Sequence, residues 1–128
     1  MDWGTAEPSY TECMGTLRTP ELTEAYHTYL AAQPAGVCHL CDTPPVEAFT
    51  YWKIIPDKFP YNKIASRHDM LVPLRHTQEV GLTVEERAEF AELKAKYLNE
   101  HYELLIETAP HLKSVPMHHH VHLIVIKD

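Results

Sequence analysis

Several features that would place the chain in a class at once are scarce in its 128 residues. No apolar run approaches the roughly 20 residues that a membrane-spanning helix needs. The N-terminal segment carries Asp2, Glu7 and Glu12 without the apolar core of a signal peptide. Basic residues number 11 against 18 acidic ones, which gives a formal charge of −7. We therefore expect no membrane anchorage and no nucleic-acid partner, because nucleic-acid binding needs a basic surface.

Cysteine is also scarce. The chain has three cysteines, and an odd number without a secretory signal argues against a disulfide framework. This usage is typical of a reducing compartment, so we expect a cytoplasmic protein. Cys38 and Cys41 form a Cys-x-x-Cys pair, which in that compartment indicates half of a zinc site or a redox pair.

Two helices are predicted from end signals and spacing. Pro20 suits a first helical turn with Thr19 as N-cap, and the apolar residues that follow recur at helical spacing, so we expect a helix over 20–32. Thr83 begins a capping box that predicts the start of a long helix over 83–107.

The remaining patterns predict strands. Segments rich in β-branched and aromatic residues occur at 46–55, at 70–74 and within 115–126, most strongly from Val121 onward. The stretch 57–67 reads as a loop. With the two helices, this order predicts a single-domain α+β fold with a mostly antiparallel sheet.

Histidine is abundant: ten are present, and four lie within five positions near the C-terminus. On a strand, His118, His120 and His122 would share one face, while His119 and Val121 would point to the other. Alternate strand positions can supply three metal ligands. Neighbouring imidazoles can also set each other's tautomers and form a nucleophilic site. Residue chemistry alone leaves both alternatives open.

The segment His118-x-His120-x-His122-Leu-Ile resembles the signature of the histidine-triad superfamily. Phe59-Pro-Tyr-Asn62 is similar to a nucleotide-side loop of several family branches, and His68 to His76 is similar to the segment in which two histidines flank an apolar strand. The Cys-x-x-Cys pair lies upstream, as in zinc-binding members. The resemblance runs from about Gly36 to Ile126.

The resemblance implies a histidine-triad-like domain over 36–128, preceded by an N-terminal arm and extra helix over 1–35. It implies attack of His120 on the α-phosphate of a nucleotide, giving a covalent nucleotidyl-histidine that splits one difficult displacement into two. His122 would position the leaving group, and His68 would lie near the phosphate. The implied activity is that of a nucleotide hydrolase or nucleotidyltransferase, such as a phosphoramidase or a dinucleoside polyphosphate hydrolase.

The resemblance also implies a structural zinc ion that holds His118 in place, bound by Cys38, Cys41, His76 and His118. Two thiolates and two imidazoles make a closed tetrahedral set. Family members are commonly dimers, so a homodimer is expected.

Phosphate chemistry needs local positive charge, which in this acidic chain must come from single residues. Arg67, beside His68, is one candidate phosphate ligand, and Asn62 of the nucleotide-side loop is another. Family members usually carry Gly-Gln-Ser/Thr before the triad, whereas Ser114 is the only candidate hydroxyl here. This departure supports an alternative function, a zinc-stabilised nucleotide-binding module with little or no turnover. A hydrolase that uses a metal held by His118, His120 and His122 is a third hypothesis.

Overall fold

The computed structural model describes residues 16–109 and 117–128. In these ranges Glu79–Gly81 (η1) form a short 3-10 turn, and Lys94–Leu98 (η2) form a π-helical turn that continues Val84–Leu93 (α4) into Asn99–His101 (α5). In chain order the elements are α2 (Pro20–Ala31), α3 (His39–Asp42), β1 (Glu47–Ala48), β2 (Trp52–Pro56), β3 (Ala65–Pro73), η1 (Glu79–Gly81), α4 (Val84–Leu93), η2 (Lys94–Leu98), α5 (Asn99–His101), β4 (Leu104–Ile106) and β5 (Val121–Ile126).

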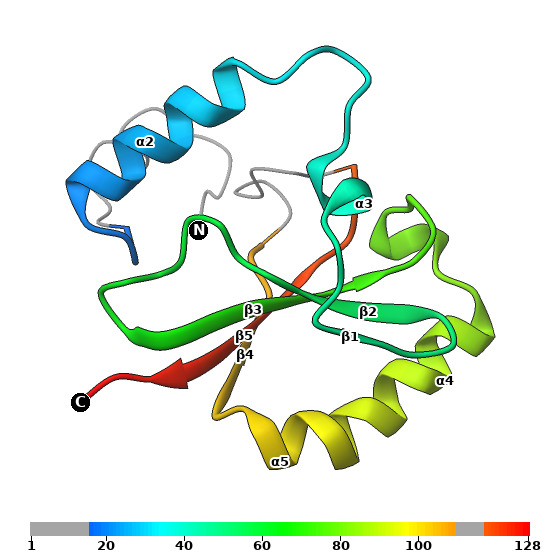
Figure 1. The fold of residues 1–128 in the computed structure, drawn as a ribbon. Helices are drawn as coiled ribbons and strands as arrows, with labels where there is room; N and C mark the ends of the chain where they lie inside the picture. The colour runs from blue at the N-terminus through cyan, green and yellow to red at the C-terminus, as the bar shows by residue number, and fades with distance from the viewer. Residues whose placement is uncertain (1–15, 110–116) are drawn as a thin grey trace, which may run out of the picture.

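One five-stranded sheet organises the fold. Its strand order is β1-β2-β3-β5-β4, and every neighbouring pair is antiparallel. The helices lie on both sides of it, with α2 and α3 on one side and α4 and α5 on the other (Figure 1). The expected α+β class with a mostly antiparallel sheet is confirmed.

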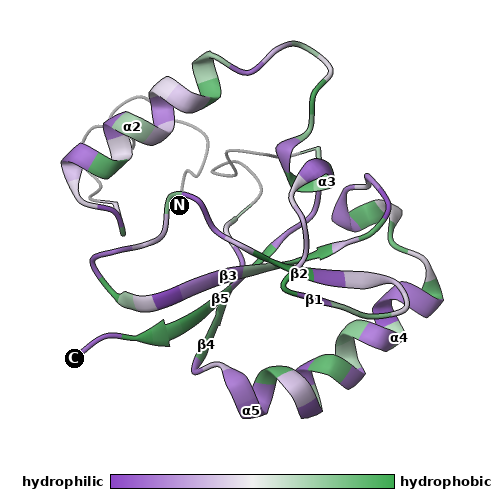
Figure 2. Cartoon of the chain, in the orientation of Figure 1, coloured by the Kyte–Doolittle hydropathy of each residue, from purple (hydrophilic) through white to green (hydrophobic). Residues whose placement is uncertain are grey.

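The main hydrophobic core lies between the sheet and the α4–α5 segment. The residues of β5 other than His122 are hydrophobic, and Figure 2 shows the C-terminal part of the strand as hydrophobic. Alternate residues of the strand pack on this core and face α2 and α3. The indole Nε1 of Trp52 donates a hydrogen bond to the carbonyl of Glu86 at 2.8 Å, which ties β2 to α4. The buried members of this core are Trp52, Ile54, Leu71, Leu93, Leu98, Tyr102, Val121 and Leu123.

Both predicted helix starts are confirmed. Pro20 occupies the first turn of α2 with Thr19 as N-cap, although the Thr19 hydroxyl accepts from the Asn62 amide instead of capping the helix. At α4 the Thr83 hydroxyl accepts from the Glu86 amide, and the Glu86 carboxylate accepts from the Thr83 amide, which forms the capping box.

Three predicted boundaries are wrong. The segment 46–55 is not one strand: β1 and β2 form a hairpin whose turn amides, at Thr50 and Tyr51, donate to the Glu89 carboxylate. The long helix ends at His101 rather than near 107. Its apolar continuation, Leu104 to Ile106, pairs with β5 instead, since a short apolar run suits a strand as well as a helix.

The third boundary concerns β3, which begins at Ala65, inside the stretch expected to be a loop, and ends at Pro73. The closing strand is confirmed from Val121 to Ile126, whereas 110–116 lie outside the described residues. Within the described ranges, no helix is both long and apolar enough to span a membrane.

Candidate functional site

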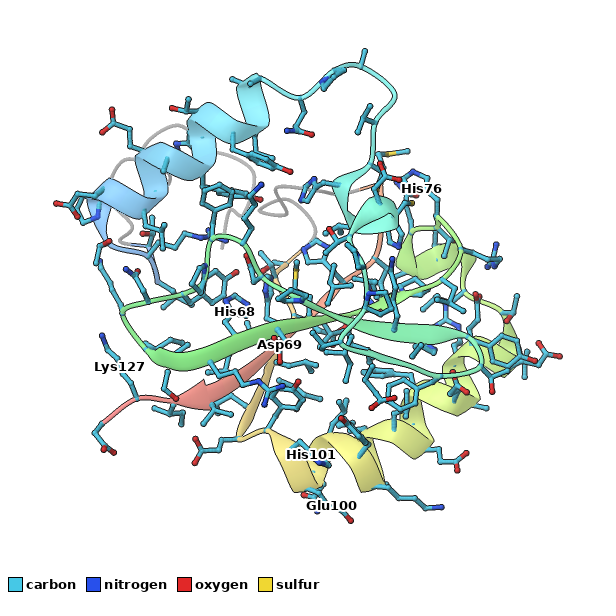
Figure 3. All side chains as sticks on the ribbon, viewed as in Figure 1. His68, Asp69, His76, Glu100, His101 and Lys127 are labelled. Atoms are coloured by element: carbon cyan, nitrogen blue, oxygen red, sulfur yellow. The ribbon has the colours of Figure 1, made fainter. Side chains whose placement is uncertain are left out.

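A group of two cysteines and two histidines lies at the end of the sheet nearest α3. Cys38 and Cys41 bracket the first turn of α3, His76 follows β3 and His118 precedes β5. Figure 3 shows His76 beside α3. The ligand atoms of the four residues all lie within 4.8 Å of one another, so the group could hold a metal ion.

The distances within this Cys2His2 group fit a tetrahedral site. His118 Nδ1 lies 3.4 Å from Cys38 Sγ, 3.3 Å from Cys41 Sγ and 3.2 Å from His76 Nδ1. Metal–sulfur and metal–nitrogen bonds of about 2.3 and 2.0 Å place tetrahedral ligands roughly 3.3 to 3.8 Å apart. The four side chains therefore stand close to the spacing that a zinc-sized ion requires.

The tautomer of His118 is set by a backbone group. Its Nε2 lies 3.0 Å from the Pro73 carbonyl, to which an Nε2–H donates, so the lone pair is on Nδ1, toward the cysteines. Burial lowers the pKa of His118, which favours the neutral, ligating form. Burial raises the pKa of the Cys41 thiol, and its hydrogen bond with Cys38 adds to that shift. A bound cation would oppose it, because metal ions stabilise thiolates.

Lys53 fixes α3 against the sheet. Its side chain projects from β2, and Nζ donates to the carbonyls of Cys41 and Thr43, both at 3.0 Å. This buried lysine was not among the predicted site residues. Nothing in its sequence context distinguishes it from a solvated base.

A second polar group, Asp57, His68 and His122, lies on the same face of the sheet. His68 Nδ1 accepts from the Tyr61 amide at 2.9 Å, so the proton of neutral His68 is on Nε2. That Nε2 lies 2.8 Å from His122 Nδ1 and 3.3 Å from Asp57 Oδ2. His122 Nε2 in turn lies 3.1 Å from the Tyr61 hydroxyl. The bonds form a chain that fixes both imidazoles.

Burial controls the protonation of this second group. It lowers the pKa of His68 to about 3, with a further contribution from the Arg18 charge, so His68 is neutral near pH 7. Burial also raises the pKa of Asp57 to about 6, although a hydrogen bond from the Phe59 amide and the charge of Arg18 oppose the rise. The ligand atoms of Asp57, His68 and His122 also lie close enough to hold a metal ion, as do those of Glu79, Glu107 and His119.

His120 lies between the two groups. Its Nδ1 is 2.9 Å from the backbone carbonyl of His118, to which Nδ1–H donates, and this bond puts the lone pair on Nε2. Its ring stands edge-on to that of His122, with centroids 5.2 Å apart. His119 points to the opposite face, where its ring packs on Trp52 at 6.0 Å.

A cavity of about 290 Å³ opens beside His120 and His122. Its floor is the sheet, and its walls come from α2, α3 and the loop after β2. Its charged side chains are Arg18, Asp57 and Lys58, and its aromatic rings come from Tyr26, Tyr29 and Phe59. The remaining lining residues are His39, Leu40, Thr43, Ile55, Pro56 and Met70. A cavity lined by imidazoles, aromatic rings and cationic side chains suits a small anionic ligand with a planar part.

The structure places the predicted histidine and cysteine site residues in two locations, the Cys2His2 group and the cavity. The structure brings His118 together with the cysteines and His76, and it brings His120 and His122 to the cavity with His68 directly behind His122. Both nitrogens of His118 are engaged, by the Cys2His2 group and by Pro73, so it does not join His120 and His122 in a three-histidine metal site.

Two predicted phosphate ligands are placed elsewhere. Arg67 lies on the opposite face, where its Nε donates to Asp69 at 2.9 Å and its guanidinium stands 5.5 Å from the Tyr102 ring. Asn62 holds the start of α2, because its Oδ1 accepts from the Thr19 amide at 2.8 Å. Ser114 lies outside the described residues.

Sequence reasoning missed Arg18, Asp57 and Tyr61. Tyr61 falls within the predicted nucleotide-side loop, and Asp57 directly follows β2, so position gave some signal for both. Arg18 lies in the N-terminal arm and reaches the site only through tertiary contacts. No protein-family model matches the chain, and no curated protein matches it significantly.

Proposed function

We propose that the chain is a zinc-stabilised histidine-triad protein that transfers or hydrolyses nucleotides through a covalent intermediate on His120. The observation that carries this proposal is the arrangement at His120. Its Nδ1 bonds to the His118 carbonyl, its lone pair is on Nε2, and it borders the cavity together with His122. A neutral imidazole held in one tautomer is a competent nucleophile near pH 7.

The proposed reaction has two displacements. In the first, Nε2 of His120 attacks the α-phosphorus, a P–N bond forms, and the P–O or P–N bond to the leaving group breaks, with the electron pair going to that group. A phosphate departs as an anion, whereas an amine takes up one proton from the solvent as its bond breaks. In the second, water or an acceptor phosphate attacks the same phosphorus and the bond to His120 breaks. Hydrolysis releases a nucleoside monophosphate and a proton, and His120 is regenerated.

The neighbouring residues support the first displacement. His122 is held by His68 and Tyr61, so its position beside the cavity is fixed before a ligand binds. The Cys2His2 group would hold zinc. When bound, that ion would anchor His118, whose carbonyl orients His120. The set of four protein ligands leaves no open position, so a structural role is proposed for it.

A second candidate is a nucleotide-binding module with little or no turnover. One observation favours it: both ring nitrogens of His122 are already within hydrogen-bond distance of protein groups, His68 and Tyr61. An imidazole engaged in this way is less available to protonate or position a leaving group.

Covalent capture separates the two candidates. Zinc-loaded protein is mixed with adenosine and guanosine phosphoramidates and dinucleoside polyphosphates, quenched in base and analysed by intact mass. The enzyme predicts a gain of one nucleotidyl group that is absent in His120→Ala and present in His101→Ala, a control on exposed α5. Nucleotide binding without an adduct or turnover would instead support the binding module.

A further inference from the structure

The N-terminal segment from Arg18 through α2 forms one wall of the cavity, although the histidine-triad resemblance begins only after it. The Arg18 Nε donates to the Phe59 carbonyl at 2.6 Å, and the Asn62 side chain bonds the Thr19 amide and hydroxyl. These contacts dock the start of α2 on the loop after β2. The segment is therefore placed where it can contact whatever enters the cavity.

Arg18 presents a positive charge to that cavity. Its guanidinium lies 4.3 Å from the ring centre of Tyr26 and 4.8 Å from that of Tyr61, so two aromatic faces hold it in place. Across the residues that the structure describes, no carboxylate is within ion-pair distance of Arg18. A half-buried guanidinium that has no carboxylate partner among the described residues is suited to an anionic ligand.

Lys58 adds a second cation at the same wall. Its ammonium stands 4.6 Å above the Tyr29 ring, and Tyr29 and Phe59 lie 5.1 Å apart. The cavity thus carries two fixed positive charges and one carboxyl group, Asp57, in a chain whose overall charge is −7. The acidic balance of the protein makes this local excess of positive charge informative.

Arg18 is also adjacent to the reacting end of the cavity. The Tyr61 ring that it covers lies 4.8 Å from the His122 ring, and the Tyr61 hydroxyl is 3.1 Å from His122 Nε2. A phosphate group next to the one that faces His120 and His122 would lie within reach of the guanidinium.

We propose that Arg18, assisted by Lys58, binds the phosphate beyond the α-phosphate, so that this site prefers ligands joined through a phosphoanhydride to phosphoramidates with a neutral leaving group. The inference rests on the proposed nucleotide site but not on turnover. It makes the segment around α2 a specificity element, with Arg18 contacting the ligand directly.

Binding measurements test the proposal without requiring catalysis. Calorimetric titration with AMP and ADP, GMP and GDP, and UMP and UDP gives the ratio of the monophosphate Kd to the diphosphate Kd for each base. The wild-type protein is expected to bind the diphosphate of its preferred base at least about tenfold more tightly. Arg18→Gln is expected to reduce that ratio to about threefold or less, and Arg18→Lys to an intermediate value.

Two further variants show whether a changed Kd ratio reflects a lost ligand contact rather than a folding defect. Lys58→Gln changes an exposed side chain, so it is expected to fold and to lower the same ratio by about threefold. Lys94→Gln removes one positive charge on the other side of the sheet and is expected to leave the ratio unchanged. Thermal unfolding of each variant shows whether it is folded at the titration temperature.

The outcomes separate the inference from the proposed function. A diphosphate preference that disappears in Arg18→Gln supports the inference even when no adduct forms on His120. An adduct on His120 with an unchanged Kd ratio in folded Arg18→Gln and Lys58→Gln overturns the inference and leaves the proposed function standing. A wild-type protein that binds neither class of nucleotide, or binds both equally, also overturns it.

Discussion

The two faces of the sheet are built from the same strands but have different roles. Toward α4 and α5 the strands contribute Trp52, Leu71 and Leu123 to a closed hydrophobic core. Toward α2 and α3 the intervening residues supply His68, His122 and the cavity. Side-chain alternation in β3 and β5 therefore places the main hydrophobic core on one face and the buried histidines on the other, where Met70 and Val72 of β3 also pack in a smaller hydrophobic cluster with Leu40 and Ile55.

The contrast is sharpest at two neighbouring residues. His68 bonds to His122 on the cavity side, while Asp69 accepts hydrogen bonds from Tyr102 at 2.6 Å and from Arg67 at 2.9 Å on the helix side. Figure 3 shows His68 and Asp69 on opposite sides of β3. A one-residue shift of β3 would exchange their surroundings, so the register of this strand is essential to both faces.

Removing the proposed metal should have the largest effect on stability, because it would remove the contacts that hold α3 on the cavity face of the sheet. The core on the opposite face would remain intact. Cys41→Ser is expected to lower the free energy of unfolding by about 4 kcal/mol, since structural metal binding is coupled to folding. Thermal unfolding with and without a chelator measures this. The wild-type protein should lose stability with the chelator, whereas Cys41→Ser should not change further.

The matched control is Asp42→Ser, an exposed neighbour of Cys41 in α3, which should keep both the metal and the wild-type stability. A wild-type unfolding curve that is unaffected by chelation, in protein shown to contain metal, would contradict a structural role for the Cys2His2 group.

Weakening the core between the sheet and α4–α5 should lower the free energy of unfolding and leave the metal site and the cavity intact. Leu98 is fully buried, so Leu98→Ala is expected to cost about 3 kcal/mol. Because the cavity is on the other face, metal content and nucleotide binding should persist where the variant is folded. Urea unfolding and metal analysis measure the two effects. Val84→Ala, at a side chain that is 80% exposed, should change stability by less than about 0.5 kcal/mol.

The ion pair that joins the segment after β3 to α4 should matter less than the core itself. Arg75 donates to both carboxylate oxygens of Glu86, at 2.7 and 3.0 Å, and this bonding lowers the pKa of Glu86 to about 2. Glu86→Gln is expected to cost about 2 kcal/mol in urea unfolding near pH 7. The matched change in the exposed pair, Glu92→Gln, should cost at most about 0.5 kcal/mol.

The acid dependence of this pair has a definite sign. The folded-state pKa of Glu86 lies below its usual value near 4.5, so its contribution is complete above that pH and is lost as the pH falls toward 2. The stability difference between wild-type protein and Glu86→Gln should therefore shrink over that range. A difference that stays constant from pH 5 to pH 2.5 would contradict the assigned ion pair.

Substitution of Asp57 should have the smallest effect on stability. Its pH dependence should be opposite in sign to that of Glu86. Burial raises its pKa from 3.8 to about 6, so the folded state loses stability as the pH rises through this range. Asp57→Asn should match wild-type stability near pH 4 and exceed it by on the order of 1 kcal/mol above pH 6. Thermal unfolding across this range checks the sign, and a variant that is less stable at pH 7 would contradict it.

The sequence predicted the parts of the molecule that local rules control. The starts of α2 and α4 follow from Pro20 and from the capping box at Thr83, whose chemistry depends on neighbours within a few residues. The alternation of His118, His120 and His122 also survives in the structure, although regular strand pairing begins only at Val121.

The errors occur where tertiary contacts decide between local alternatives. Leu104 to Ile106 continues the apolar spacing of the preceding helix but forms β4, because β5 offers an open edge for pairing. Arg67 was a candidate phosphate ligand because it adjoins His68 in the sequence. In β3, a register shift between Ala65 and Arg67 and the alternation that follows place it with Asp69. Arg18 reaches the cavity only because α2 docks on the loop after β2, which no local pattern encodes.

The most direct test of the account is to locate the nucleotide on the protein. Base-quenched protein is digested, and the fragment that covers 117–128 is sequenced by mass spectrometry, with His120→Ala and His122→Ala beside the wild type. A nucleotidyl group is expected on His120 in fully folded, metal-containing wild-type protein, and none is expected in His120→Ala that unfolds at the same temperature. An adduct that persists in His120→Ala, or that maps to another residue, would contradict the assignment of His120 as the nucleophile.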